Sequence, residues 1–425
     1  MRRRGAVALC AAASVAISVL VPAAPAAADP VRDLQYWLDE YGISEAWQTT
    51  RGAGVTVAVI DTGIDASHPD LAGAVVGGTD VSGLGSPDGL RPIGEPGEDS
   101  HGTLVASLVA GRGHAPGDGV IGVAPAASLL SVSVGFGLGD VPSDDQIAQA
   151  VRWSVDNGAD VINMSLTRNT LDWPESWDDA FLYAMENDVV VVAAAGNRGS
   201  GTTTVGAPAT MPGVLTVAGV DRDEQASFDA SSQGITISVA APSEELVGAL
   251  PGGGYARWEG TSGAAPLVSG VVALVRAAHP ELDAANVIQR VLATAHPVGE
   301  PVPGPIYGYG IVDAAAAVTA DVARVDANPM GDLAEWVRLY RRANVPSVPE
   351  TSTAPLPPEE RTDAEDPQAA ADPIGVLYPG VEQLRTLGLP LGVVVAFLGG
   401  ALWIIVAGLR PRTTATGARG RRARE

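Results

Sequence analysis

Lysine is absent from this chain and cysteine is almost absent. All 26 basic side chains among its 425 residues are arginine, so any mechanism that needs a lysine base or a Schiff base is excluded. The single cysteine, Cys10, lies in an apolar N-terminal run, and we expect neither a disulfide nor a cysteine-ligated metal in the mature protein. A cysteine nucleophile is excluded for the same reason.

Positive charge is also scarce. The 26 basic residues stand against 49 acidic ones, which gives a formal net charge of −23. Such a charge repels the phosphates of DNA and RNA, so we expect no nucleic-acid partner. The length suits one large domain with attachments, because single hydrophobic cores stop growing near roughly 250–300 residues.

Two apolar segments indicate that the chain is exported and anchored in a membrane. Residues 1–28 combine three arginines, an apolar stretch and a run of alanines that ends at Ala28, which is the pattern of a cleavable signal peptide. An uncleaved signal anchor is the alternative. Residues 386–409 carry no charge and are long enough to cross a bilayer as one helix.

The residues around the second apolar segment set the predicted topology. The tail 410–425 contains six arginines, and the positive-inside rule places it in the cytoplasm and the main domain outside the cell. Residues 345–385 are rich in proline and acids, which predicts an extended stalk. The sequence therefore predicts a single-pass protein of the cell membrane whose domain is held away from the bilayer.

The apolar pattern of residues 29–325 predicts an α/β domain with a short N-terminal extension. Short β-branched apolar runs alternate with helical patterns, which is typical of a mainly parallel sheet covered on both faces. The predicted strands are residues 55–60, 129–134, 161–166, 189–194 and 214–220. The predicted helices are 144–157, 177–187 and 262–279, with Ser143 and Ser176 as N-caps of the first two.

A further amphipathic helix is expected within residues 326–344. Leu333, Trp336 and Val337 recur there at helical spacing beside several arginines. Such a helix would either pack on the domain or lie at a membrane surface.

Asp61 stands where a buried strand of the sheet is expected to end. Open α/β sheets place catalytic groups at the carboxyl ends of their strands, and an aspartate there could orient a histidine. The triplet Asp61-Thr62-Gly63 also occurs in aspartic proteases. Those enzymes need a second triplet of the same kind, which this sequence lacks.

His101 is the candidate general base. It opens a predicted helix after a glycine-rich loop, and an imidazole with an ordinary pKa of about 6.5 can accept and return a proton near neutrality. A structural histidine is the alternative. The remaining histidines lack a comparable motif; they are His68, His114, His279 and His296.

Ser262 and Asn197 complete the candidate site. Ser262 lies at a loop-to-helix transition, where free N–H groups and the helix dipole favour a developing oxyanion. It is the candidate nucleophile, with a plain helix cap as the alternative. Asn197 follows a buried strand and Gly196, and its amide could donate a hydrogen bond to the oxyanion or be an ordinary loop residue.

The chain order of these residues resembles that of the subtilases, a family of serine proteases. Asp61 comes first, then His101, then Asn197 and finally Ser262. The resemblance extends over residues 41–318. It includes His68-Pro69-Asp70-Leu71, Gly122-Val123-Ala124-Pro125 and Asn163-Met164-Ser165-Leu166.

The resemblance implies a three-layer subtilisin-like fold and a serine endopeptidase. Asp61 would hold His101, which takes the proton of Ser262 as an acyl-enzyme forms. Asn197 and the Ser262 amide would stabilise the oxyanion. An esterase with Ser262, Asp283 and His296 is the alternative, but the spacing is cramped and the serine lacks a Gly-x-Ser-x-Gly elbow.

By the same resemblance, a peptide substrate would add as a strand between two edges of the domain. The residues of these edges are Ser165, Leu166 and Thr167 on one side and Gly135, Phe136 and Gly137 on the other. The glycine-rich loop is not a dinucleotide fingerprint, because Asp140 and Pro142 stand where a final glycine is needed.

No cofactor and no metal are expected. Asp70 matches a position that often ligates calcium in subtilases. Residues 111–119, however, lack the asparagine-rich loop that completes such a site.

A narrower resemblance is to the mycosins, membrane-anchored subtilases associated with bacterial type VII secretion. It is carried by the short N-terminal extension, the apolar segment 386–409 with its basic tail, and His101-Gly102-Thr103-Leu104-Val105-Ala106. It implies that the substrates are extracytoplasmic proteins. It also implies that the partners are membrane proteins of a secretion complex. Two alternatives remain open: a structural partner of the complex with dispensable protease activity, and a general degradative surface protease.

Overall fold

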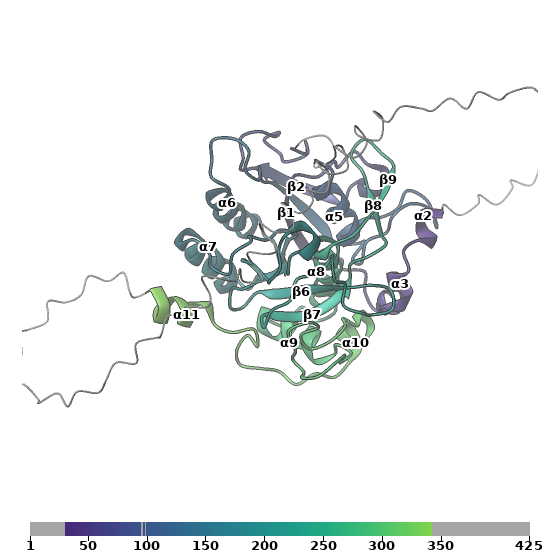
Figure 1. The fold of residues 1–425 in the computed structure, drawn as a ribbon. Helices are drawn as coiled ribbons and strands as arrows, with labels where there is room; N and C mark the ends of the chain where they lie inside the picture. The colour runs from purple at the N-terminus through teal and green to yellow at the C-terminus, as the bar shows by residue number, and fades with distance from the viewer. Residues whose placement is uncertain (1–29, 95–96, 98, 342–425) are drawn as a thin grey trace, which may run out of the picture. The chain divides into compact units, whose positions relative to one another are not determined.

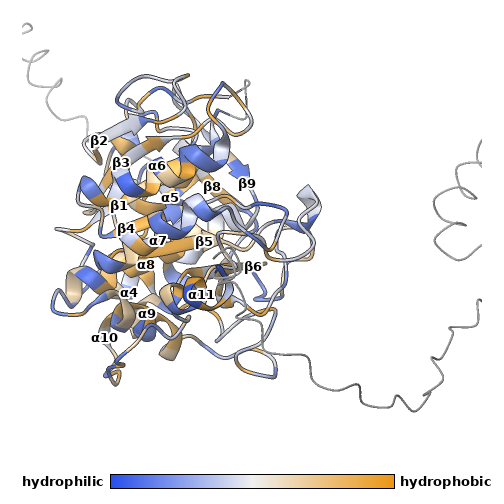
Figure 2. Ribbon diagram, turned by 90° about the vertical axis from the view of Figure 1, so that its left-hand side faces the viewer, coloured by the Kyte–Doolittle hydropathy of each residue, from blue (hydrophilic) through white to orange (hydrophobic). Residues whose placement is uncertain are grey.

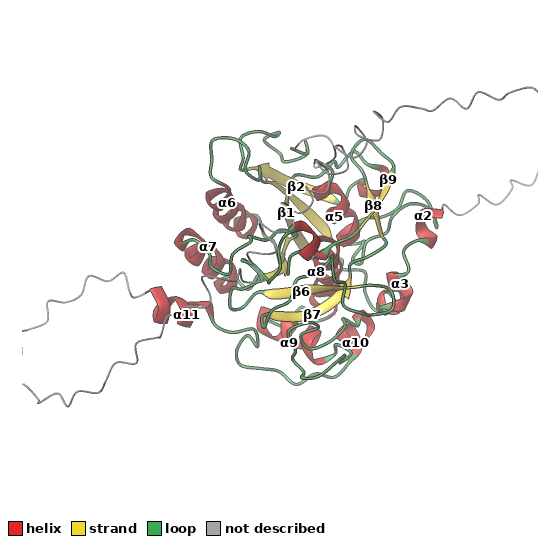
Figure 3. Cartoon of the chain, in the orientation of Figure 1, coloured by secondary structure: helices red, strands yellow, loops and turns green. Residues whose placement is uncertain are grey.

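The computed structural model describes residues 30–94, 97 and 99–341. The predicted signal peptide, stalk, transmembrane helix and basic tail lie outside these residues. Within them, the chain forms a seven-stranded sheet between two layers of helices and a separate two-stranded hairpin (Figure 1, Figure 3). The predicted three-layer α/β class is confirmed.

All strand pairs in the large sheet are parallel. In spatial order its strands are β2 (Val75–Asp80), β3 (Ser128–Ser133), β1 (Thr56–Asp61), β4 (Val161–Met164), β5 (Val190–Ala194), β6 (Leu215–Val220) and β7 (Ile237–Pro242). The hairpin pairs β8 (Leu246–Ala249) with β9 (Tyr255–Trp258). Each of the five predicted strands lies within two residues of its predicted bounds, whereas β2, β7 and the hairpin were not predicted.

Four long helices cover the sheet. Helices α6 (Ser143–Asp156) and α7 (Glu175–Glu186) pack on each other and on one face, and α5 (His101–Ala110) and α8 (Thr261–Ala278) pack on the other. Figure 2 shows apolar residues gathered in the strands and along α8. Among the described residues, α8 alone is long and apolar enough to cross a membrane, and 83% of its apolar window is buried inside the domain. It is therefore a core helix.

The predicted N-caps of α6 and α7 are wrong. Each helix is preceded by a proline, Pro142 or Pro174, and neither cap position makes a side-chain hydrogen bond. Ser143 lies inside α6, and its hydroxyl accepts a hydrogen bond from the Gly137 N–H at 2.9 Å. Both prolines have the non-helical backbone typical of a residue that precedes a helix, but a proline side chain has no oxygen to accept a hydrogen bond from the first helical N–H groups.

The N-terminal extension is part of the domain rather than a loose arm. Trp37 is fully buried in the core, and Gln35 exchanges two hydrogen bonds with the backbone of Ile121, at 2.8 and 2.9 Å. Its helices are α2 (Pro30–Asp33), α3 (Trp37–Glu40) and α4 (Ile43–Ala46). The helices that follow α8 are α9 (Ala284–Ala293), α10 (Ala314–Thr319) and α11 (Leu333–Tyr340).

Helix α11 lies within the predicted amphipathic segment and packs on the domain. The rings of Trp336 and Trp173 are 4.4 Å apart between centroids. Arg341, just beyond the helix, donates to the Asp178 carboxylate of α7 at 2.8 Å. Of the two expected placements, the structure shows packing on the domain.

Candidate active site

Asp61 and His101 meet at the carboxyl end of the central strand β1. The Nδ1 of His101 lies 2.9 Å from both carboxylate oxygens of Asp61, which is 1% exposed. The Thr62 N–H also donates to this carboxylate, at 2.7 Å, so the aspartate is held by its own turn. An ionised carboxylate only accepts hydrogen bonds, so Nδ1 carries the proton and Nε2 is left as an acceptor.

Two opposing effects act on the pKa of His101. Burial disfavours the charged imidazolium and lowers the pKa, but the negative charge of Asp61 and its hydrogen bond favour that form. Burial is the largest single effect, but the charge of Asp61 and its hydrogen bond together outweigh it, so the pKa of His101 is raised above its ordinary value of 6.5. His101 is therefore a better proton acceptor than a free imidazole.

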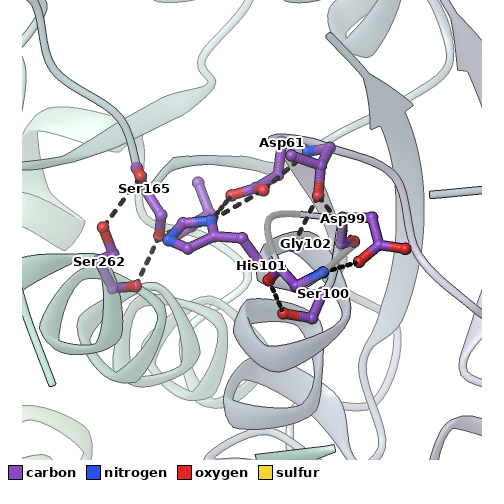
Figure 4. A network of polar contacts seen from close by, with 10 residues as sticks. Asp61, Asp99, Ser100, His101, Gly102, Ser165 and Ser262 are labelled. Carbon is purple, nitrogen blue, oxygen red and sulfur yellow. Dashed lines mark hydrogen bonds and ion pairs between the residues drawn. The ribbon is translucent and has the colours of Figure 1, made fainter. Parts of the chain in front are cut away.

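Ser262 lies in the first turn of α8, next to the imidazole. Figure 4 shows His101 between Asp61 on one side and Ser262 and Ser165 on the other. The Ser262 hydroxyl donates to the backbone carbonyl of Ser165 at 3.2 Å, and the Ser165 hydroxyl donates to the Ser262 carbonyl at 2.8 Å. Because the Ser262 hydroxyl is directed to Ser165, no hydrogen bond joins Ser262 to His101 in this structure.

Asn197 is anchored by the oxygen of its side chain. That oxygen accepts from the Thr261 N–H and from the Thr261 hydroxyl, both at 2.8 Å. The amide NH₂ is thus the end of Asn197 that remains for an oxyanion beside Ser262. Gly260 is required here, because its φ is +130° and a Cβ at this position would come within 2.7 Å of the Asn197 nitrogen.

The predicted substrate edges line one cavity of about 580 Å³ with His101. Its walls include Ser165, Leu166 and Thr167 of one edge and Gly135 and Phe136 of the other. Gly137 is exposed and is not part of the lining.

Trp258 also lines this cavity and was not predicted. Its ring stands edge-on to His101, with centroids 5.8 Å apart. It lies four residues before Ser262, and this proximity in the sequence was the one signal that could have indicated it.

Other sequence candidates lie elsewhere in the domain. Asp283 caps α9 by accepting from the Asn286 N–H at 2.9 Å, and His296 pairs through its backbone with Ile311. Neither contacts Ser262 as an esterase triad would require. Sequence order alone had left that alternative open.

The fully buried carboxylate of Asp70 is occupied by protein groups. It accepts from His114 Nδ1 and from the Val120 N–H, both at 2.7 Å. Over the described residues, no group of three or more histidine, cysteine, aspartate or glutamate side chains could hold a metal ion.

A buried aspartate bonded to a histidine, beside a serine at a helix start and an amide donor, is the arrangement that activates a serine for acyl transfer. The class defined by this fold and site is a serine-type endopeptidase. The chain belongs to the subtilase family, whose model matches residues 52–310. The predicted family and enzyme class are confirmed.

Relatives of known sequence support the same assignment. The chain is 39% identical to subtilisin E of Bacillus subtilis (strain 168) over 286 residues, which cover 65% of this chain and 70% of subtilisin E. It is 37% identical to mycosin-4 of Mycobacterium tuberculosis (strain ATCC 25618 / H37Rv) over 330 residues, which cover 66% of this chain and 68% of mycosin-4.

A solved structure similar to this chain is that of the MycP3 protease from the type VII (ESX-3) secretion system. It aligns with a TM-score of 0.58 and 34% sequence identity, over 71% of this chain and 91% of that one. The predicted resemblance to mycosin-like subtilases is confirmed.

Proposed function

We propose that Asp61, His101 and Ser262 form the catalytic triad of this endopeptidase and that Asn197 is its oxyanion donor. The observation that carries this proposal is the contact of His101 Nδ1 with both oxygens of the buried Asp61. It fixes the tautomer whose free Nε2 can accept a proton.

The geometry supports a two-step acyl transfer. Ser262 Oγ attacks the peptide carbonyl while His101 Nε2 takes its proton, and the Asn197 amide and the Ser262 N–H bind the oxyanion. The carbon–nitrogen bond then breaks, and the amine leaves with the proton from His101. Water, deprotonated by the same imidazole, releases the acyl group from Ser262.

The proposed substrates are proteins on the extracytoplasmic side of the cell membrane, processed as part of type VII secretion. The predicted signal peptide 1–28, membrane helix 386–409 and basic tail 410–425 support this location. The similarity to mycosin-4 and to the MycP3 protease supports the secretion role. In a deletion strain, restored secretion by a Ser262→Ala chain would instead favour the structural-partner function.

A fluorophosphonate probe tests the catalytic proposal directly. The full-length chain, purified in detergent, is treated with the probe alongside Ser262→Ala and Ser269→Ala variants. Ser269 lies in the same helix but is buried and hydrogen-bonded to Asn163 at 2.9 Å, so it serves as the control. We expect labelling of the wild type and of Ser269→Ala, mapped to Ser262. A folded wild-type protein that stays unlabelled would refute the proposed triad.

A further inference from the structure

A second cavity adjoins the candidate oxyanion hole. Its volume is about 500 Å³, and it shares no lining residue with the cavity that contains His101. Its walls come from Asn197, Gly199 and Ser200 after β5, from Asp229 and Ala230, and from Glu259 and Gly260 just before α8. Asn197 and Gly260 therefore belong both to this cavity and to the surroundings of Ser262.

The position of this cavity identifies the part of a substrate that it would receive. The hydrogen bonds between Ser262 and Ser165 show that the edge 165–167 lies on one side of the nucleophile. With the acyl part of a peptide along that edge, the chain after the cleaved bond continues on the opposite side. The cavity bounded by Asn197, Glu259 and Gly260 shares no residue with that edge and adjoins Ser262 through Asn197 and Gly260, so it would receive this part of the substrate.

The cavity is lined by two carboxylates and by no basic side chain. Asp229 and Glu259 are both exposed, and neither forms a salt bridge with any residue in the described part of the chain. Arg198, in the same segment as Asn197, instead has its guanidinium stacked 4.5 Å over the ring of Phe228. The cavity thus presents two carboxylates that form no salt bridge within the described residues.

The backbone around both carboxylates is fixed by hydrogen bonds. The Gly199 N–H donates to the Asp229 carbonyl at 2.8 Å, and the Gly260 N–H donates to the Ser243 carbonyl at 2.7 Å. The position of Gly260 is further set by its close approach to Asn197. Glu259 and Asp229 are therefore presented from positions tied to the catalytic residues.

We propose that Asp229 and Glu259 make this endopeptidase select substrates with a basic residue on the leaving-group side of the cleaved bond. A guanidinium or ammonium group there would be paired by both carboxylates. Because these carboxylates are exposed, the preference is modest, roughly threefold to tenfold, and weakens as salt is added. This inference rests on the proposed function, which places the scissile bond at Ser262.

The test uses peptide binding, which does not depend on catalysis. Two peptides share an apolar N-terminal half, suited to the cavity that contains Phe136 and Leu166, and differ in carrying two arginines or two citrullines in the C-terminal half. Citrulline keeps the shape of arginine without its charge. Binding of each peptide to the full-length Ser262→Ala chain is measured by calorimetry at low and high salt.

The expected result is tighter binding of the arginine peptide by roughly threefold to tenfold at low salt. Adding Asp229→Asn and Glu259→Gln should reduce the ratio below about twofold. Adding Asp179→Asn and Glu186→Gln removes the same charge from the exposed face of α7 and should leave the ratio unchanged.

The inference would be overturned if the arginine and citrulline peptides bound with equal affinity. It would also be overturned if the ratio of their affinities persisted in the Asp229→Asn, Glu259→Gln variant, or if the control variant lost as much of that ratio. Incubation of the same peptides with the wild-type chain tests the proposed function separately. Uncleaved peptides with intact selectivity would refute the function while supporting the role of the carboxylates in binding. Cleaved peptides without selectivity would support the proposed function and refute the role of the carboxylates in binding.

Discussion

At the scale of single residues, the protonation state of His101 should determine how kcat/KM depends on pH. In the proposed triad only the neutral imidazole can take the Ser262 proton, so kcat/KM should rise as pH rises through the His101 pKa. Because Asp61 raises that pKa, the acid limb of the profile should lie above pH 6.5. Hydrolysis rates of a small peptide substrate measured from pH 5 to 9 give the midpoint.

Asp61→Asn should lower both the rate of hydrolysis and the pH of the acid limb. The rate should fall by about 10⁴-fold, as in another enzyme with this triad, because the amide stabilises the wrong tautomer. The residual activity should have its acid limb at lower pH, since the charge that raised the His101 pKa is gone. Asp140→Asn removes an exposed carboxylate and should leave both rate and midpoint unchanged. An unmoved midpoint in Asp61→Asn would contradict this account.

Asn197 should act on the transition state and not on substrate binding. In the proposed mechanism its NH₂ group binds an oxyanion that exists only after attack, so Asn197→Ala should lower kcat by about 10²–10³ with little change in KM, the effect known for the subtilisin asparagine. Asn187→Ala is the matched control, because Asn187 only caps the exposed end of α7. A loss confined to KM would assign Asn197 to substrate binding instead.

The site residues that were predicted from the sequence lie next to strand or helix patterns that are recognisable over a short stretch of residues. Asp61 ends a mostly apolar strand of 6 residues and His101 opens a helix of 10 residues, so each pattern is local in the sequence. Trp258 and Glu259 carry no such pattern. They reach the site because the hairpin of β8 and β9 leads directly into α8, a tertiary placement that no local rule gives.

At the scale of secondary-structure elements, α11 offers a test of how the end of the domain is attached. Trp336 is half-buried against Trp173, so Trp336→Ala should lower the free energy of unfolding of α11 from the domain by about 1–2 kcal/mol, less than for a fully buried tryptophan. Faster hydrogen exchange of α11 with unchanged exchange of β1 would show this. Leu339→Ala, at a 52% exposed position, should change neither.

Strands β2 and β7 were not predicted because neither has the residue pattern that identifies a strand. Strand β2 contains two adjacent glycines and is only partly buried, so it has neither the apolar run nor the alternation that identifies a strand. Strand β7 is fully buried, but Ser238 interrupts its apolar residues and Pro242 ends it, and a proline argues against a central strand. Both became strands through pairing with β3 and β6, which periodicity does not encode.

At the scale of the whole molecule, catalysis and anchoring should be separable. Every residue assigned here to the site lies between positions 61 and 262, and the packed elements run from α2 to α11. A chain ending at residue 344 lacks the predicted stalk, membrane helix and basic tail but keeps all of these elements. It should therefore fold and retain the probe reactivity of Ser262.

Truncation at residue 344 should change the localisation of the enzyme but not the probe reactivity of Ser262. Residues 386–409 are the predicted membrane helix, and without them the truncated enzyme should move from the membrane fraction to the culture medium. Cell fractionation followed by fluorophosphonate labelling measures both properties in one experiment. Retention of the truncated chain in the membrane would show that an earlier segment, such as an uncleaved 1–28, anchors it. Release with loss of labelling would mean instead that residues beyond 344 support the fold of the site.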